Sequence, residues 1–224
     1  IKYHWYFPGY DPMYNHNQSE NLARVSYYGI SGVPHALIDG SSISGPNYLG
    51  APANCTQAKI DEAYAIPSPF DIYVQHRLSN NEDTIYTTTL IEATDDVSGS
   101  LYAHVVVIEK HISFNSAPGS NGEKDFYDVM KKMLPGSNGT SMPNTMGSGD
   151  YVLLEYAWPL ANVYDINELG VVSFVQNNSG KNVKQAANSS TEEIVPLYEN
   201  DVEILSLSNL TSISEERRVG KECI

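Results

Sequence analysis

The chain has 224 residues, a formal net charge of −14 at pH 7 and an isoelectric point near 4.7. This acidity argues against a surface that binds nucleic-acid phosphates, which needs clustered Lys and Arg, and no apolar run approaches the roughly 20 residues of a membrane-spanning helix. The length allows one or two domains with a core, and 16 Tyr with abundant Ser, Thr, Asn and Gly are typical of a β-rich protein outside the cytoplasm.

Residues 1–66 alternate between strand and helix patterns. The chain opens on the strand-like IKYHWYF, after which Asn17 and Glu20 have the spacing of a helix capping box. Helical spacing then continues up to Gly29, a residue that suits the end of a helix. The apolar positions of this predicted helix are Leu22, Ala23, Val25 and Tyr28.

The stretch YYGISGVPHALIDG, residues 27–40, joins that helix to a short apolar strand at 35–38 that ends in the turn dipeptide Asp-Gly. It resembles the part of the thioredoxin fold in which a helix leads into a cis-proline. Pro34 stands at the position of that proline, so we predict a cis Val33–Pro34 bond, because a cis bond is accessible at low cost only before proline.

A second helix is predicted after an irregular stretch. Thr56 is its candidate N-cap, and Pro67 and Pro69 end it. Its apolar positions are Ile60, Ala63 and Tyr64. The order strand, helix, strand, possible strand, helix matches the C-terminal half of a thioredoxin-like domain. We therefore expect the chain to begin inside such a domain.

The redox chemistry of the thioredoxin fold needs a Cys-x-x-Cys pair, and this chain has none. Its two cysteines, Cys55 and Cys223, lie far apart and have no neighbouring cysteine at redox or metal-ligand spacing. The resemblance therefore predicts a scaffold without its catalytic pair.

Residues 67–190 change to the period of β-strands. Alternating or β-branched runs predict strands at 69–78, 84–94, 101–114, 151–158 and 169–176. Turn-forming segments between them favour an antiparallel sandwich. A single helix is predicted between the strands, with an apolar stripe that ends at Pro135-Gly136. That stripe consists of Phe126, Val129, Met130, Met133 and Leu134.

Residues 191–224 are predicted to contain a linker and the start of a further β domain, at NDVEILSLSNLTS. The final segment, 214–224, is dense in charged residues and resembles a translated read-through from cloning or assembly. We therefore expect this tail to be non-native and give Cys223 no functional weight.

Five segments in chain order resemble one family, the Omp28-related outer membrane proteins of the Bacteroidetes phylum. They are residues 5–40, AIPSPFDI, HVVVIEK, DVMKKMLPGSNGT and GVVSFVQNNSGKNVKQAA. The resemblance covers roughly residues 1–190. It implies a partial thioredoxin-like domain at 1–66 followed by an immunoglobulin-like β-sandwich at 67–190, an α+β chain that lies in the cell envelope, associated with the outer membrane or secreted.

Two hypotheses for function follow. The first is a non-catalytic envelope or surface protein that uses both modules as a scaffold or binding surface for an unknown protein or surface ligand. The alternative is a fragment of an extracytoplasmic thiol-disulfide oxidoreductase whose Cys-x-x-Cys lies upstream of residue 1.

Candidate site residues each have a structural explanation that we favour. Pro34 and Cys55 are explained as a retained fold element and a lone thiol. The histidines His4, His16 and His35 match no compact metal pattern, and the acidic groups Glu92, Asp95, Asp96 and Asn80 to Asp83 fit solvated turns better than calcium loops. The methionines Met130, Met133, Met142 and Met146 suit core packing.

No nucleophile elbow or phosphate-binding loop is present in the sequence. We therefore predict no catalytic, cofactor-binding or metal-binding residue, and no cofactor.

Overall fold

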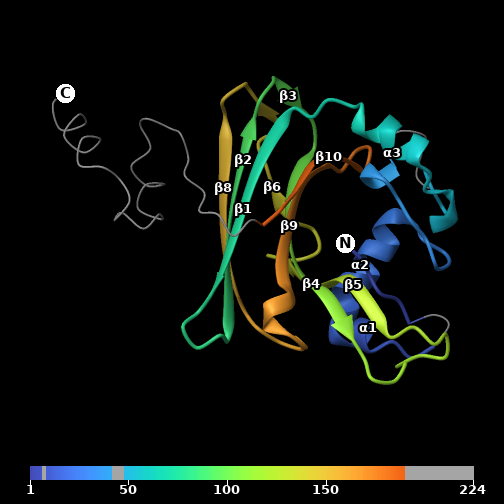
Figure 1. The fold of residues 1–224 in the computed structure, drawn as a ribbon. Helices are drawn as coiled ribbons and strands as arrows, with labels where there is room; N and C mark the ends of the chain where they lie inside the picture. The colour runs from blue at the N-terminus through green and yellow to red at the C-terminus, as the bar shows by residue number, and fades with distance from the viewer. Residues whose placement is uncertain (7–8, 42–47, 190–224) are drawn as a thin grey trace.

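The computed structural model describes residues 1–6, 9–41 and 48–189 (Figure 1). The predicted strand at 200–212 and the suspected non-native tail with Cys223 lie outside the described residues. Within the described part, the chain is mainly antiparallel β-sheet with few helices, and no helix there is long and apolar enough to cross a membrane.

Two antiparallel sheets dominate the fold. A three-stranded sheet has the order β1-β2-β8 and consists of β1 (Phe70–Leu78), β2 (Thr84–Ala93) and β8 (Tyr151–Pro159). A five-stranded sheet has the order β10-β9-β4-β5 and consists of β10 (Asn182–Asn188), β9 (Leu169–Asn177), β4 (Leu101–Ser113), β5 (Asp125–Leu134) and β6 (Thr140–Ser141), the last paired with β4. The short strands β3 (Val97–Ser98) and β7 (Thr145–Met146) pair with each other.

All five predicted strands are present, as β1, β2, β4, β8 and β9. The main core lies between the two sheets, which face each other in Figure 1. Leu101, Ala103 and Val105 of β4 belong to this core, whereas Val106 and Ile108 belong to a second cluster on the opposite face of the sheet. β4 is thus buried on both faces.

The helix predicted at Phe126–Leu134 is wrong, because these residues lie in strand β5. The segment is a strand that pairs with β4, and a one-residue register shift leaves Lys131 as a β-bulge. Met130 and Met133 pack in the second cluster, whereas Leu134 packs in the core between the sheets. A strand covered on both faces and carrying one extra residue has apolar positions three and four apart, as an amphipathic helix does.

The helices occupy the first third of the described chain, together with one 3-10 turn near β9. They are α1 (Pro12–His16), α2 (Gln18–Tyr28), η1 (Asp39–Ser41), η2 (Pro52–Asn54), α3 (Gln57–Tyr64) and η3 (Ile166–Glu168). Both predicted helices are confirmed, since α2 begins after the N-cap Asn17 and ends at Gly29, whose φ of 68° is left-handed, and α3 follows the predicted N-cap Thr56.

Other local predictions at the N-terminus have mixed outcomes. The Val33–Pro34 bond is cis as predicted. The predicted strand at 35–38 is reduced to one bridge between Ala36 and Gly50, and within the described residues the strand-like start of the chain pairs only through Lys2, which lies parallel to Val129 of β5.

Candidate functional site

The free edge of β5 is covered first by the start of the chain. The backbone N–H of Lys2 donates to the carbonyl of Asp128 at 2.7 Å, and the N–H of Met130 donates to the carbonyl of Lys2 at 3.0 Å. An edge strand otherwise exposes unpaired N–H and C=O groups that invite pairing with another chain. Lys2 therefore acts as a short additional strand at this edge.

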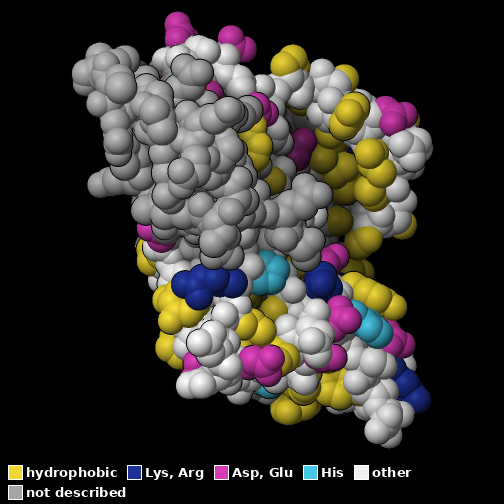
Figure 2. All heavy atoms as spheres, turned by 60° about the vertical axis from the view of Figure 1, so that its left-hand side comes forward, with side chains coloured by type: hydrophobic (Ala, Val, Ile, Leu, Met, Phe, Trp, Pro, Cys, Tyr) yellow, Lys and Arg dark blue, Asp and Glu magenta, His cyan; other side chains and the backbone are white. Residues whose placement is uncertain are grey.

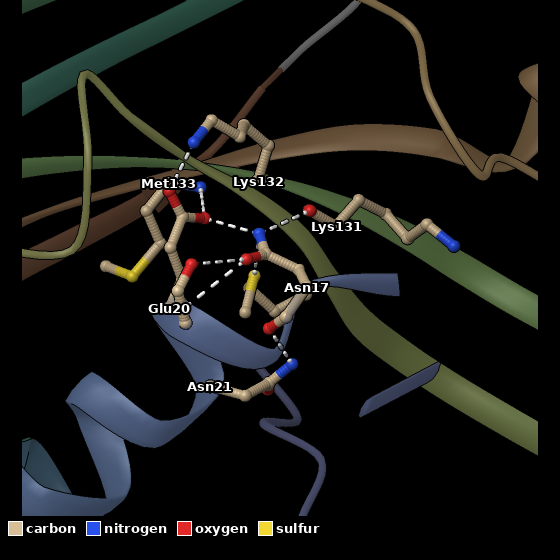
Figure 3. Close-up of polar contacts among 8 residues, drawn as sticks. Asn17, Glu20, Asn21, Lys131, Lys132 and Met133 are labelled. Atoms are coloured by element: carbon tan, nitrogen blue, oxygen red, sulfur yellow. Dashed lines mark hydrogen bonds and ion pairs between the residues drawn. The ribbon is translucent and has the colours of Figure 1, made fainter. Parts of the chain in front are cut away.

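Side chains of the first turn of α2 continue this cover along β5 (Figure 3). The amide of Asn17 donates to the carbonyl of Lys131 at 3.0 Å, and the N–H of Met133 donates to the Glu20 carboxylate at 2.8 Å. These two backbone groups lie further along the same strand. Two side chains at the start of α2 thus make the hydrogen bonds that a neighbouring strand would otherwise make.

Glu20 is the centre of this arrangement. The Lys132 ammonium pairs with one carboxylate oxygen, and the other oxygen accepts from the Asn17 amide at 2.6 Å as well as from Met133. The side chain of Glu20 is only 8 % exposed. The predicted capping box is therefore only half formed. The Asn17 side chain accepts from the N–H of Glu20 at 3.3 Å, but the Glu20 carboxylate bonds the backbone of β5 and does not return to the N–H of Asn17.

Asn21 and His4 extend the polar network to the chain start. The Asn21 side chain accepts from the N–H of His4 and donates to the carbonyl of Asn17, both at 2.8 Å. The ring of His4 contacts the Asp11 carboxylate at 2.7 Å, and Asp11 in turn caps α1 through the N–H of Tyr14. Burial would raise the pKa of Asp11, but the hydrogen bond and charge of His4, together with backbone hydrogen bonds from Tyr14 and Met13, outweigh it and lower that pKa.

Arg24 lies one turn after Glu20 and is buried, with 3 % of its surface exposed. Its Nη2 donates to the Gln176 side chain and to the Tyr28 hydroxyl, both at 2.9 Å. Four aromatic rings surround the guanidinium at 4.6 to 5.9 Å, namely Tyr3, Tyr27, Tyr28 and Phe174. No described carboxylate forms an ion pair with Arg24.

His104 of β4 lies in the same region, on the face of the sheet that α2 covers. Its ring stacks on Phe174 with centroids 4.7 Å apart, and both ring nitrogens are buried without a hydrogen-bond partner. Burial, together with the positive charge of Arg24, lowers the pKa of His104 to about 3. The ring is therefore neutral at physiological pH.

A buried ion pair joins β4 to β5 nearby. Lys131 contacts Glu109 at 3.1 Å, and both side chains are at most 1 % exposed. Glu109 also accepts from the backbone N–H groups of Tyr164 and Asp165, at 3.0 and 2.6 Å. Burial lowers the pKa of Lys131 against the opposing effect of Glu109. The bulge at Lys131 thus supplies a cation that fixes the loop before η3.

A pocket of about 410 Å³ opens beside this polar region. It lies between the start of α2, at Ser19 and Glu20, and the loop Pro135–Gly139 that follows β5. The inner side of that loop touches His104: a Cβ built on Gly139, whose φ is +70°, would stand 2.8 Å from the His104 ring. Gly139 therefore permits a close approach that no other residue allows.

The candidate site residues named from the sequence do not form a common site in the structure. Cys55 is exposed and free. His4 pairs with Asp11 and His16 contacts Lys131, while the Nε2 atom of His35 is buried without a partner. Among the described residues, no group of three or more His, Cys, Asp or Glu could hold a metal ion.

The four methionines are core residues, as predicted. Met130 and Met133 lie in the cluster under α2, whereas Met142 and Met146 lie between the two sheets. The two pairs belong to separate clusters and form no common thioether site. The acidic turn residue Asp83 accepts from Ser79 and Thr84, which lowers its pKa.

Sequence reasoning missed Arg24, His104, Glu109 and Lys131. A signal was present for Glu109, because a single acid that ends the apolar run VVVI indicates a buried, paired carboxylate. His104 begins the same run. The bulge that turns Lys131 inward is set by strand register and has no local pattern.

The buried ion pairs of this region have structural roles. The carboxylates of Glu20 and Glu109 and the ammonium groups of Lys131 and Lys132 are used in pairs, and on the face in Figure 2 the basic side chains form small separate groups. None of these pairs places a base beside a nucleophilic hydroxyl or thiol in hydrogen-bond reach.

One protein-family model matches most of the chain. The family model described as outer membrane protein Omp28 matches residues 21–193. Among solved structures, a domain of the outer membrane lipoprotein Omp28 from Porphyromonas gingivalis is similar at 16% identity and a TM-score of 0.38, covering 56% of this chain and 90% of that one. No curated protein sequence matches the chain.

Parts of two β-glucosidases are also similar to this chain. The enzyme from Kluyveromyces marxianus in complex with glucose matches at 13% identity and a TM-score of 0.28, over 56% of this chain and 14% of its own length. The enzyme 3B from Thermotoga neapolitana in complex with glucose matches at 16% identity and a TM-score of 0.27, over 56% and 16%.

Proposed function

The chain belongs to the Omp28 outer membrane protein family, and from this premise we propose that it is a non-catalytic protein whose N-terminal segment is a structural cover for a β-domain that binds a partner. Family membership makes it a cell-envelope protein associated with the outer membrane. The proposal concerns what the described residues do there.

The observation that carries the proposal is the cover on the edge of β5. Lys2, Asn17 and Glu20 together bond four backbone groups of that strand. The polar side chains of Asn17 and Glu20 are thus used to bond the strand edge. A buried carboxylate with three donors has little capacity left for chemistry.

The proposal also includes the type and the boundary of the two domains. Residues 1–66 are a thioredoxin-like half that has kept its helices and its proline, and residues 67–190 are an immunoglobulin-like β-sandwich, with the boundary near Pro67 to Pro69. Support comes from the helix α2 ending at Gly29 before Pro34, and from the core that the two sheets share. In this arrangement the thioredoxin-like half stabilises the sandwich, which presents the binding surface.

An insulin-reduction assay tests the non-catalytic part of the proposal. The purified chain is compared with Cys55→Ser, because Cys55 is the exposed free thiol of the described chain. Thiol–disulfide exchange needs an attacking thiolate and normally a resolving thiol close by. We expect no turnover in either protein. Turnover in the parent that disappears in Cys55→Ser would overturn the proposal.

A further inference from the structure

The edges of the two main sheets differ in how they are covered. In the described chain these sheets end in β1, β8, β10 and β5. The edge of β5 carries Lys2, Asn17 and Glu20. The strands β1 and β10 lie beside each other, and the side chain of Gln185 in β10 donates to the carbonyl of Phe70 in β1 at 3.0 Å (Figure 1). Strand β8 is the remaining edge, and no described element pairs with its outer side.

The outward-facing backbone groups of β8 follow from its pairing with β2. The N–H of Ala93 donates to the carbonyl of Asp150 at 2.8 Å, just before β8 begins. The N–H of Leu160 donates to the carbonyl of Asp83 at 2.7 Å, just after β8 ends. The register between these two bonds is regular, and bonds in an antiparallel pair involve every second residue of a strand. The even-numbered residues of β8 therefore bond β2, whereas the odd-numbered residues direct their N–H and C=O groups away from it.

Three of the odd-numbered residues, Leu153, Glu155 and Ala157, form the open part of this edge. No hydrogen bond from elsewhere in the described chain reaches their backbone groups. Glu155 and Ala157 are exposed, and Leu153 is half-buried. An edge of this kind is a template for pairing with a further strand. Such pairing would extend the sheet β1-β2-β8 by one strand.

The side chains of these three residues lie on the outer face of the sheet, because the residues between them pack toward the core. On that face, the register of β1, β2 and β8 places the carboxylates of Asp71, Glu92 and Glu155. Its guanidinium is that of Arg77, which lies over the ring of Tyr86. Glu155 forms no ion pair within the described chain. An acidic edge of this kind favours a basic partner and disfavours an acidic one.

Charge decides between the occupants of this edge. A second copy would bring a net charge of −14 and a second Glu155 to it. The segment NDVEILSLSNLTS, at 200–212, has acidic residues and no Lys or Arg. Each of these two occupants would bring like charges together, which is unfavourable between neighbouring strands. A basic segment of another protein is the occupant that matches the charge of the edge.

We propose that the outer edge of β8 is a docking site for an extended, basic segment of a partner protein, which pairs with Leu153, Glu155 and Ala157 as an additional strand. Its Lys or Arg side chains contact Glu155, and its alternate, apolar side chains extend the core-facing row of Leu154 and Tyr156. In this mode main-chain bonds supply affinity and alternate side chains supply specificity. The inference rests on the proposed function, because it names the surface of the sandwich that binds and the chemistry of the partner.

Amide hydrogen exchange of the full chain, with and without a short peptide of alternating Val and Lys, tests the site. We expect saturable protection of the Leu153, Glu155 and Ala157 amides, by about tenfold or more at saturating peptide. The same peptide with Glu in place of Lys should protect none of them. The amide of Leu154 faces β2 and is the internal control, whose exchange should not change.

A charge reversal assigns the preference to this edge. Glu155→Lys is expected to bind the Glu peptide and to lose about tenfold in affinity for the Lys peptide. The matched control is Asp71→Lys, which changes the net charge equally on the same face but lies in β1, at the opposite edge of the sheet. This control should still prefer the Lys peptide.

Four results would overturn the β8 site. The first is no protection of the three amides by the Lys peptide. The second is strong protection in the free chain at every protein concentration, which means that the chain itself covers the edge. The third is protection that rises with protein concentration alone, which means a second copy. The fourth is an equal change of preference in Glu155→Lys and Asp71→Lys, which means general attraction to an acidic protein. None of these results decides the non-catalytic role, which insulin reduction tests separately.

Discussion

At the scale of single residues, this protein buries several ionisable side chains. Glu20, Arg24, His104, Glu109 and Lys131 are all buried. Each carries a desolvation penalty that only specific partners offset. Their positions therefore determine how stability depends on pH and on substitution.

His104 makes stability depend on pH in the acidic range. Its pKa falls from 6.5 in the unfolded chain to about 3 in the fold. The unfolded chain therefore binds the proton first, and stability is lost as pH falls below 6.5. Since one pKa unit is worth about 1.4 kcal/mol, His104 should remove about 3 kcal/mol of the free energy of unfolding between pH 7 and pH 4.

Urea unfolding of the parent and of His104→Phe at both pH values measures this contribution. The variant should lose much less stability on acidification than the parent. An equal loss in the two proteins would show that other groups govern the acid response.

The Glu109–Lys131 pair gives a second residue-scale prediction. Lys131→Met leaves a buried carboxylate without its cation and should lower the free energy of unfolding by about 3 to 5 kcal/mol. Adding Glu109→Gln should recover part of the loss, because the amide oxygen can still accept from Tyr164 and Asp165. Urea denaturation of the double-mutant cycle checks this, with exposed Lys110→Met as the control that should change little.

Sequence reasoning at this scale identified residues with local signals and missed those set by tertiary contacts. The N-cap Asn17 and the left-handed Gly29 are fixed by helix ends, so their roles could be predicted. The two further partners of Asn17 and Glu20, Lys131 and Met133, lie more than a hundred residues away in sequence, and no local pattern indicates which strand edge a helix will cover.

At the scale of elements, the pairing of α2 with the edge of β5 is the most informative feature. Glu20→Ala removes the acceptor of the Met133 N–H and the partner of Lys132. An unsatisfied buried donor costs about 1 to 3 kcal/mol. We expect this loss in stability, together with faster hydrogen exchange at the Met133 amide.

The control for this substitution is Gln18→Ala on the same helix. Gln18 is exposed and bonds only Asn15 among the described side chains, so its removal should leave the exchange of Met133 as it is. Unchanged exchange in Glu20→Ala as well would mean that α2 does not protect the strand edge.

The strands also show where the spacing of apolar residues in the sequence predicts secondary structure correctly and where it does not. β1 was predicted because its apolar residues alternate along one face, and β2 was predicted because it is rich in β-branched residues. β5 was predicted as a helix because both faces are buried and a bulge shifts its phase. β10 carries few large apolar residues, so its pairing with β9 is decided by the neighbouring strand rather than by its own sequence.

At the scale of the whole molecule, the central claim is that the N-terminal segment is an integral part of the β-domain's stability. Contacts along α2 support it at both ends, from Glu20 with Lys132 to Tyr27, whose hydroxyl donates to Asn178 at 2.8 Å. A segment fastened in this way should unfold together with the sheets, whereas a tethered module should unfold separately.

The two tryptophans of the chain report on the two parts: Trp5 lies in the N-terminal segment and Trp158 in β8. Urea unfolding followed by fluorescence in Trp158→Phe and in Trp5→Phe therefore measures each part alone, with circular dichroism of each variant giving its global transition. The account predicts that in each variant the fluorescence and circular dichroism midpoints coincide. A Trp5 transition at clearly lower urea than the global unfolding of the same variant would contradict it.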